Sequence, residues 1–139
     1  IRLYDGAASV KGMSVGSRYV KGGKVSNWPI NRILLSYFAS LYVRIITWMP
    51  VKDTTAGFVC YHRSVLEAID LKKIQFVGYA FQIELKFKAY KNNFKILEIP
   101  IIFRDRIYGE SKMNGDIILE AIFGLIKLKI YSFFNDLNK

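Results

Sequence analysis

Two apolar segments, residues 30–48 and 115–134, stand out in the hydrophobic pattern of the chain, and each is long enough to form a helix. The first follows Pro29, which suits the first position of a helix, and precedes Pro50, which cannot continue one. Within it, polar residues recur every four positions, at 32, 36, 40 and 44. At 3.6 residues per turn, these positions form one narrow polar stripe on an otherwise apolar helix.

The polar stripe supports two interpretations. In one, the helix is buried on most sides and the stripe touches solvent. In the other, the apolar flank meets lipid and the stripe lines a groove for an acceptor. The segment approaches the length that spans a bilayer, but two arginines within it would be costly there, so an interfacial helix is favoured. In the second segment, the longest uninterrupted apolar run, residues 121–126, is too short to span a membrane.

Residues 79–90 carry two periodicities at once. Apolar residues at 81, 83, 85 and 87 alternate with polar ones, as in an exposed strand, whereas positions 79, 83, 87 and 90 form a helical stripe. Periodicity alone leaves both alternatives open. Shorter patterns predict a helix end at 1–10, a short helix at 63–69, loops at 21–28 and 105–112, and strands at 15–20, 56–61, 94–98 and 101–104, with Pro100 marking an edge or a bulge.

Composition points to a folded domain with a basic surface. The 139 residues are 52% apolar, and 21 Lys and Arg against 11 Asp and Glu give a net charge of +10. Such a surface attracts nucleic acid, anionic lipid or phosphorylated substrates without choosing among them. The single cysteine, Cys60, excludes an internal disulfide and is expected in the core, while His62 is expected at the surface or a helix start.

A glycine-rich segment separates two arginines that are expected to meet. Arg18 lies near the end of the first predicted strand, and Arg32 lies in the first turn of the long apolar helix. Arginine makes planar, charge-assisted contacts with phosphate, and a helix N-terminus adds unpaired N–H groups. The arrangement therefore predicts a phosphate site.

Four short motifs follow one another in a fixed order within about a hundred residues. They are Gly-Ser-Arg-Tyr at 16–19, Asp-Thr-Thr-Ala-Gly-Phe at 53–58, Phe-Gln-Ile-Glu at 81–84 and Arg-Ile-Tyr-Gly-Glu-Ser-Lys at 106–112. From about residue 14 to residue 113, this succession resembles the polyprenol-phosphate (dolichol-phosphate) mannosyltransferases of glycosyltransferase family 2. The resemblance implies an α/β fold, the C-terminal part of a GT-A domain with a mixed sheet flanked by helices.

The resemblance also implies that residues 1–139 are the acceptor-side part of a single catalytic domain. The family's nucleotide-binding half carries paired aspartates that hold a divalent metal, Mg or Mn, and neither Asp-Asp-Gly-Ser nor Asp-x-Asp occurs here. We therefore expect the N-terminal half, with the metal ligands, to be absent and the fragment alone to be inactive.

The implied reaction is inverting transfer of a hexose, most often mannose, from a nucleotide sugar such as GDP-mannose to polyprenyl or dolichyl phosphate. The implied location is the cytoplasmic face of a membrane, as a peripheral protein that binds no nucleic acid.

The resemblance implies roles for particular residues. Arg18, Arg32 and Ser36 match the acceptor-phosphate site. The alternative is that Arg18 pairs with an acid and Ser36 bonds back to a helix carbonyl. The donor diphosphate would be covered by a loop whose matching residues are Arg106, Gly109, Ser111 and Lys112. The alternative there is that Ser111 caps the last helix and the cations are solvated.

Two acidic residues have open roles. Asp53 is the candidate carboxylate near the reacting centre, as base or orienting group, or else the cap of the turn that follows it. Glu84 either orients a cation such as Arg18 or Lys112, takes part in the active site, or forms a buried ion pair. Gly57 and Gly78 are expected to allow a close backbone approach or an unusual dihedral.

Two other functions compete with the transferase. A membrane-surface scaffold would use segments 30–48 and 115–134 as lipid anchors without catalysis. A nucleic-acid-binding module would need a basic face with exposed aromatic residues, but the aromatic residues here fall mostly within apolar runs.

Overall fold

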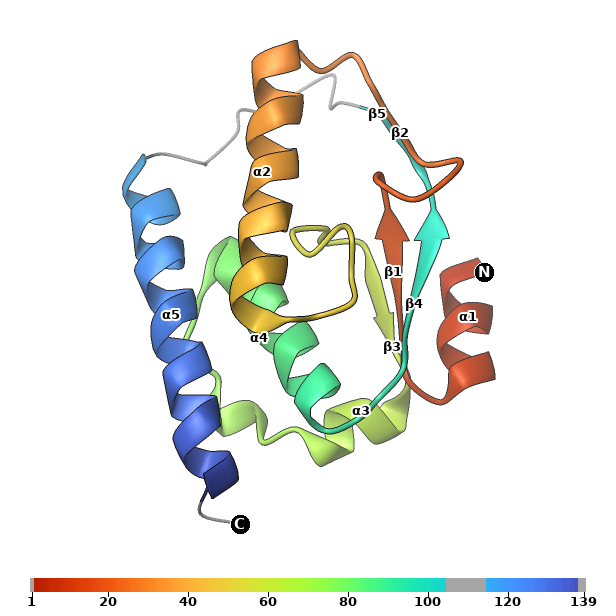
Figure 1. Ribbon diagram of the computed structural model, residues 1–139. Coiled ribbons are helices and arrows are strands. Elements are labelled where there is room, and N and C mark those ends of the chain that lie inside the picture. Colours follow the sequence, from red (N-terminus) through yellow and green to blue (C-terminus); the bar gives the residue numbers. More distant parts are fainter. Residues whose placement is uncertain (1, 105–114, 138–139) are drawn as a thin grey trace.

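The computed structural model describes residues 2–104 and 115–137 (Figure 1). Its centre is a three-stranded sheet in which β1 (Met13–Ser17) lies between β3 (Val59–Tyr61) and β4 (Ile96–Pro100). β3 runs antiparallel to β1, with Met13 opposite Tyr61, and β4 runs parallel to it, with Met13 opposite Ile96. The sheet is therefore mixed, and Pro100 lies in an edge strand of the described sheet, where its missing N–H costs no ladder bond.

Helices cover both faces of this sheet. Helix α1 (Arg2–Val10) packs on β1 and β4 through Gly6, where a Cβ atom would come within 2.7 Å of Ile99. On the opposite face, Met13 and Val15 pack into a cluster with residues of α3 (Arg63–Ala68) and α4 (Gly78–Lys91). Side chains on a strand alternate between its faces, so the five residues of β1 serve both layers, and all five are buried.

A second, smaller sheet extends from the end of the first. β2 (Lys24–Ser26) pairs in parallel with β5 (Ile102–Arg104), with Lys24 opposite Ile102. The expected loop at 21–28 therefore contains a strand, which the sequence did not indicate because it is three residues long and polar at both ends. The first predicted strand is also displaced, since β1 ends at Ser17 rather than at residue 20.

Three helices form the other side of the molecule. Helix α2 (Ile30–Thr47) confirms the first apolar segment as a helix, and α5 (Gly115–Leu137) confirms the second. They lie side by side in Figure 1, and the Tyr42 hydroxyl donates to the Ile122 carbonyl at 3.0 Å. A second core cluster fills the space where α2, α4 and α5 meet, formed by Val43, Met49, Val51, Ile83, Phe87 and Leu125.

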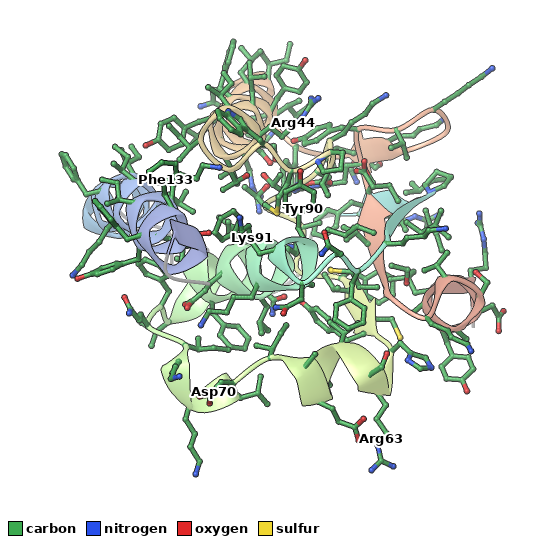
Figure 2. All side chains as sticks on the ribbon, turned by 60° about the horizontal axis from the view of Figure 1, so that its bottom comes forward. Arg44, Arg63, Asp70, Tyr90, Lys91 and Phe133 are labelled. Atoms are coloured by element: carbon green, nitrogen blue, oxygen red, sulfur yellow. The ribbon has the colours of Figure 1, made fainter. Side chains whose placement is uncertain are left out.

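The ambiguous segment is helix α4, and its place explains the double pattern. Figure 2 shows α4 between α2 and α3 and beside α5, with Tyr90 on the side of α2. Leu85 and Ala89 join the cluster on the sheet side, whereas Ile83 and Phe87 join the cluster on the side of α2 and α5. A helix that buries two opposite sides carries apolar residues at alternate positions, which imitates a strand.

Of two predictions about single residues, the one for His62 is confirmed and the one for Cys60 is wrong. His62 is the N-cap of α3, and its Nδ1 atom accepts from the Ser64 N–H, which confirms the expected helix start. Cys60 is a free thiol, but it is half-buried rather than part of the core.

Candidate functional site

Arg18 is anchored at the end of β1 by a buried carboxylate. Asp53 has no exposed surface, and its oxygens accept from the Arg18 backbone N–H at 2.8 Å, from Nε at 2.7 Å and from Nη2 at 2.6 Å. Burial alone would lower the pKa of the guanidinium, but the hydrogen bonds and charge of Asp53 outweigh it and raise the pKa. Arg18 is therefore a fixed cation with a set orientation.

Asp53 begins a tight turn, residues 53–56, that is held from several directions. The Ala56 N–H donates to the Asp53 carbonyl at 3.3 Å and closes the turn. From β4, the Glu98 carboxylate accepts the backbone N–H groups of Lys52 at 2.8 Å and Asp53 at 3.0 Å. The turn thus carries the acid that orients Arg18, and Glu98 fixes where the turn begins.

Helices α2 and α4 hold the same 53–56 turn. From α2, the Ser40 hydroxyl lies 3.0 Å from the Thr55 hydroxyl, which also accepts from Arg18 Nη2 at 3.1 Å. The Ser40 carbonyl accepts from the Thr54 hydroxyl at 3.3 Å. From α4, the Lys86 ammonium donates to the carbonyls of residues 54 and 56. Ser40, on the polar stripe of α2, therefore faces the protein interior.

The two arginines expected at the phosphate site, here the arginine pair Arg18 and Arg32, share one aromatic ring. The Arg32 Cζ atom lies 4.0 Å from the ring centroid of Trp28, and the Arg18 Cζ atom lies 5.4 Å from it. Cations over an indole face are attracted by its quadrupole, so Trp28 favours keeping both guanidiniums near one another. Phe103 of β5 supports the indole edge to face at 5.2 Å.

Two polar groups beside the arginine pair lack partners. The Trp28 Nε1–H and the Tyr19 hydroxyl are both buried and make no hydrogen bond within the described part of the chain. The Tyr19 ring lies 5.1 Å from the Arg18 Cζ atom. Buried donors without a partner are costly, so groups of this kind are typical of sites that a polar ligand completes.

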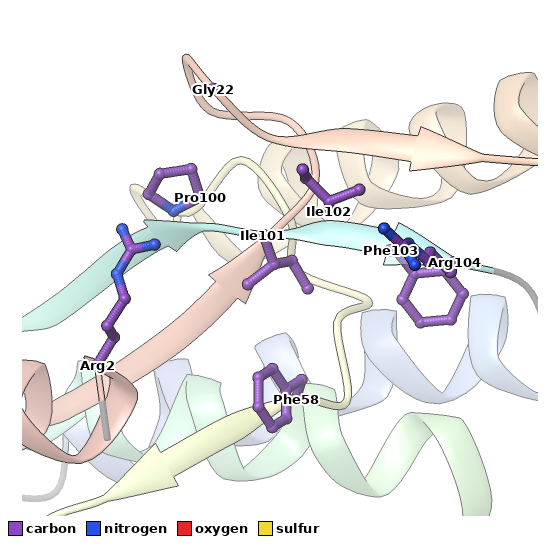
Figure 3. A pocket seen from close by; sticks show the side chains of 8 residues that line it. All are labelled: Arg2, Gly22, Phe58, Pro100, Ile101, Ile102, Phe103 and Arg104. Atoms are coloured by element: carbon purple, nitrogen blue, oxygen red, sulfur yellow. The ribbon is translucent and has the colours of Figure 1, made fainter.

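A cavity of about 690 Å³ lies next to this cluster and shares Phe103 with it (Figure 3). Its walls are mostly apolar, and Arg2 of α1 and Arg104 of β5 stand at opposite ends. Phe58 forms part of the wall and packs closely on Gly16, where a Cβ atom would lie 2.8 Å from the Phe58 ring. The arrangement can accommodate an apolar group beside an anion held by arginine.

The remaining predicted site residues fall in different places. Ser36 lies half-buried on α2, one turn after Arg32. Glu84 accepts the N–H groups of Gln75 at 2.9 Å and Phe76 at 3.0 Å and pairs with Lys88 at 2.8 Å, so it does not orient Arg18. The four residues of the expected donor loop, namely Arg106, Gly109, Ser111 and Lys112, lie outside the described residues.

Sequence reasoning missed three contributors, Trp28, Lys86 and Glu98. A tryptophan placed between a Gly- and Lys-rich segment and a helix start was a usable signal. Lys86 was hidden because its alternating neighbours suggested an exposed position, and Glu98 because a lone acid in a strand carries no signature. Within residues 2–104 and 115–137, no group of three His, Cys, Asp or Glu residues could hold a metal, and no helix is long and apolar enough to cross a membrane.

No family model matches the chain, but curated proteins do. Polyprenol monophosphomannose synthase of Mycolicibacterium smegmatis is 45% identical over 122 residues, which cover 88% of this chain and 46% of that protein. Undecaprenyl-phosphate mannosyltransferase of Micrococcus luteus is 42% identical over 113 residues, 81% of this chain and 46% of the relative. Dolichol-phosphate mannosyltransferase of Pyrococcus furiosus is 34% identical over 131 residues, 91% of this chain and 35% of the relative.

These similarities show that the chain is related to glycosyltransferases. Its mixed α/β architecture agrees with part of a GT-A domain. More narrowly, the chain is homologous over most of its length to polyprenyl-phosphate mannosyltransferases of glycosyltransferase family 2. The chain spans about half the length of the first two of these relatives and about a third of the other.

Proposed function

We propose that this chain is the acceptor-side part of a glycosyltransferase domain that transfers mannose from a nucleotide sugar to polyprenyl phosphate. The observation that carries the proposal is the arginine pair gathered on Trp28, beside a cavity with apolar walls. A polyprenyl phosphate joins a dianionic head to an apolar chain, so both halves of the site have a counterpart in the ligand. The names of the relatives support the same acceptor.

The proposed reaction makes limited demands on side-chain chemistry. A phosphate oxygen of the acceptor attacks the anomeric carbon of the sugar, the bond to the nucleoside diphosphate breaks, and the configuration inverts. Because a phosphate monoester is already a charged nucleophile, orientation and charge compensation matter more than a strong base. Arg18, Arg32 and the Ser36 hydroxyl hold the phosphate. Asp53, which already accepts three N–H groups from Arg18, acts as the orienting group.

The donor side is proposed to lie largely elsewhere in the protein. GDP-mannose is the proposed donor, with its diphosphate covered by Arg106, Gly109, Ser111 and Lys112. The described residues do not fit a divalent metal, because they contain no cluster of ligands. When bound, Mg or Mn would compensate the charge of the leaving diphosphate, and its ligands would belong to the nucleotide-binding half.

The proposed location is the cytoplasmic face of a membrane, with α2 and α5 against the lipid. We define the outer face as a set of exposed apolar residues on these two helices and at the C-cap of α2. They are Ile30, Leu34, Phe38, Ile45, Trp48, Phe123, Ile130, Phe133 and Phe134. The Lys129 ammonium lies 4.1 Å from the ring centroid of Trp48 at the end of α2. Exposed aromatic and aliphatic side chains combined with lysine are typical of interfacial helices.

The test uses the full-length protein that contains this chain. Arg32→Ala should abolish transfer of mannose to polyprenyl phosphate and leave binding of the nucleotide sugar measurable by calorimetry. The matched control is Arg63→Ala, which removes an arginine whose side chain is 88% exposed on α3. Unchanged turnover in Arg32→Ala, or equal losses in both variants, would contradict the proposed site.

The outer face favours one second candidate, a membrane-surface scaffold without catalysis. Exposed apolar surface of this extent on two neighbouring helices indicates a docking surface whether or not the chain takes part in transfer. Vesicle binding that persists when Arg18, Arg32, Arg106 and Lys112 are neutralised, together with no transferase activity in the full-length protein, would favour the scaffold.

A further inference from the structure

Lys86 is the largest fully buried side chain in the described structure and the only lysine among its fully buried residues. It lies in the middle of α4, and its side chain points to the 53–56 turn rather than to solvent. Nζ donates to the Thr54 carbonyl at 3.0 Å, to the Ala56 carbonyl at 2.5 Å and to the Gln82 carbonyl at 3.4 Å. A buried ammonium needs all three of its hydrogens paired, and three carbonyls supply that.

Two of these carbonyls flank Thr55. Residues 54 and 56 are the neighbours of Thr55, whose hydroxyl accepts from Arg18 Nη2, and Asp53 next to them accepts from the same guanidinium. The ammonium therefore binds backbone carbonyls of the turn, while two side chains of the same turn bind Arg18. A change in the hydrogen bonds between Lys86 and the turn would tilt the turn and alter the direction in which the remaining N–H groups of Arg18 point.

We propose that Lys86 is a positioning residue of the phosphate site, which acts through the 53–56 turn to set the orientation of Arg18. This role rests on the proposed acceptor function of the arginine pair. Lys86 itself does not contact the substrate, because it is fully buried behind the turn.

The protonation state of Lys86 should matter, because only the ammonium has three donors. Burial lowers the pKa of Lys86 to about 7, while Asp53 opposes this change and Arg18 adds to it. The neutral amine offers two donors and one lone pair, so one carbonyl would lose its partner and face that lone pair. The other charged groups of α4 near this point, Glu84 and Lys88, pair with each other and contact residues 73–76 instead.

The test compares Lys86→Met with the wild type in the full-length protein at pH 6 and pH 8.5. The KM for polyprenyl phosphate should rise roughly tenfold in the variant at pH 6, and the ratio of the two KM values should be smaller at pH 8.5, where the wild-type amine has already lost one of its three donors. Ionisation of the acceptor phosphate affects both proteins equally and cancels in the ratio. The KM for the nucleotide sugar should stay within about twofold.

Lys88→Met is the matched control, since it removes a lysine of the same helix that does not touch the 53–56 turn. It should leave the acceptor KM unchanged at both pH values. An equal effect of the two variants, or a ratio for Lys86→Met that is the same at pH 6 and pH 8.5, would overturn the proposal because either result indicates general destabilisation.

A measurement on the wild type covers the case in which Lys86→Met does not fold or the protein has no transferase activity. In 15N NMR, the Arg18 Nε–H resonance should titrate with a midpoint near 7, together with the Nζ resonance of Lys86. A flat Arg18 resonance between pH 6 and pH 8.5 would overturn the positioning role. Co-titration in a protein without transferase activity would keep the coupling and reject the proposed function separately.

Discussion

Helices α2 and α4 both contact the 53–56 turn, yet they differ in which side chains they bury and which they expose. Helix α2 directs Ser40 to the turn and leaves Ile30, Phe38 and Ile45 more than half exposed. Helix α4 has no surface-exposed face over residues 83–87 and buries both Glu84 and Lys86. Helix α2 directs both a hydroxyl and the apolar Val43 into the protein and leaves other apolar residues exposed, whereas α4 is enclosed and carries charge inside.

The difference separates two uses of polar groups. On α2, burial of a hydroxyl costs little, and the apolar surface is left over for a partner outside the molecule. On α4, burial of an ammonium and a carboxylate costs much more and is offset by specific partners. Lys86 donates to three carbonyls, and Glu84 pairs with Lys88 and accepts two backbone N–H groups. The anchoring of Arg18 therefore depends on charged groups from the enclosed helix and the sheet, while α2 supplies Arg32 and the outer face.

The sharpest test of this contrast uses one residue type on each helix. Phe87 of α4 is 1% exposed and Phe38 of α2 is 58% exposed. Phe87→Ala should lower the free energy of unfolding by about 3–5 kcal/mol, because it opens a cavity where α2, α4 and α5 meet. Phe38→Ala should change it by less than about 0.5 kcal/mol.

Urea unfolding measures both effects, and vesicle binding separates them further. Phe38→Ala should weaken binding to anionic vesicles, since it removes apolar area from the outer face. Large destabilisation by Phe38→Ala would mean that α2 is covered by protein, and the contrast between the helices would then be lost.

The next largest effect concerns the anchor between the sheet and the turn. Asp53→Asn keeps the shape of the side chain but leaves the Arg18 guanidinium without its buried counter-charge, so we expect a loss of roughly 3 kcal/mol in unfolding free energy. Acceptor binding should fall with it. Asp70→Asn is the control, because its ion pair with Lys73 is at the surface and should contribute less than about 1 kcal/mol. A near-neutral Asp53→Asn would show that Arg18 is held by the turn backbone alone.

Trp28 tests whether Arg18, anchored at the end of β1, and Arg32, carried by α2, meet at one ring. Trp28→Leu removes the face on which both guanidiniums lie, which corresponds to about 0.5–1 kcal/mol for each cation, and should raise the acceptor KM several-fold. Trp28→Phe keeps an aromatic face and should lie between the wild type and Trp28→Leu. If the two variants bind acceptor equally well, the indole does not organise the arginine pair.

The sequence predicted the helices best and the contacts between distant residues least. Segments 30–48, 63–69 and 115–134 are helices because their period and flanking residues are local properties. The stripe on α2 was predicted as well, but not its direction, because hydropathy cannot distinguish a lipid-facing surface from a core-facing one. The interpretation in which α2 is buried on most sides with its stripe in solvent is wrong, because Ser40 of the stripe is buried and the apolar Ile30, Phe38 and Ile45 are exposed.

In the candidate site, too, the individual residues were predicted but the contacts between them were not. Arg18, Arg32, Ser36 and Asp53 were selected by motif, and their proposed roles stay predictions. The pairing of Arg18 with Asp53 joins residues far apart in sequence, so no local pattern could decide between the alternatives for either. Gly57 has neither of the expected properties, since a Cβ atom there would meet nothing within 4 Å and its φ is not positive.

The last effect is the pH dependence that Lys86 gives to stability. Its pKa is lowered from 10.5 to about 7 by burial, so between these values the unfolded chain holds a proton that the folded chain lacks. The free energy of unfolding should therefore rise with pH in this window, with a slope of at most one proton, and this contribution should be flat below about 7. Urea unfolding from pH 6.5 to 9.5 should show this slope in the wild type and its absence in Lys86→Met. An identical slope in both would mean that another group titrates. Because protonation costs global stability while completing the three bonds to the 53–56 turn and Gln82, the ammonium on the enclosed helix α4 is better explained by the orientation of Arg18 than by the stability of the fold.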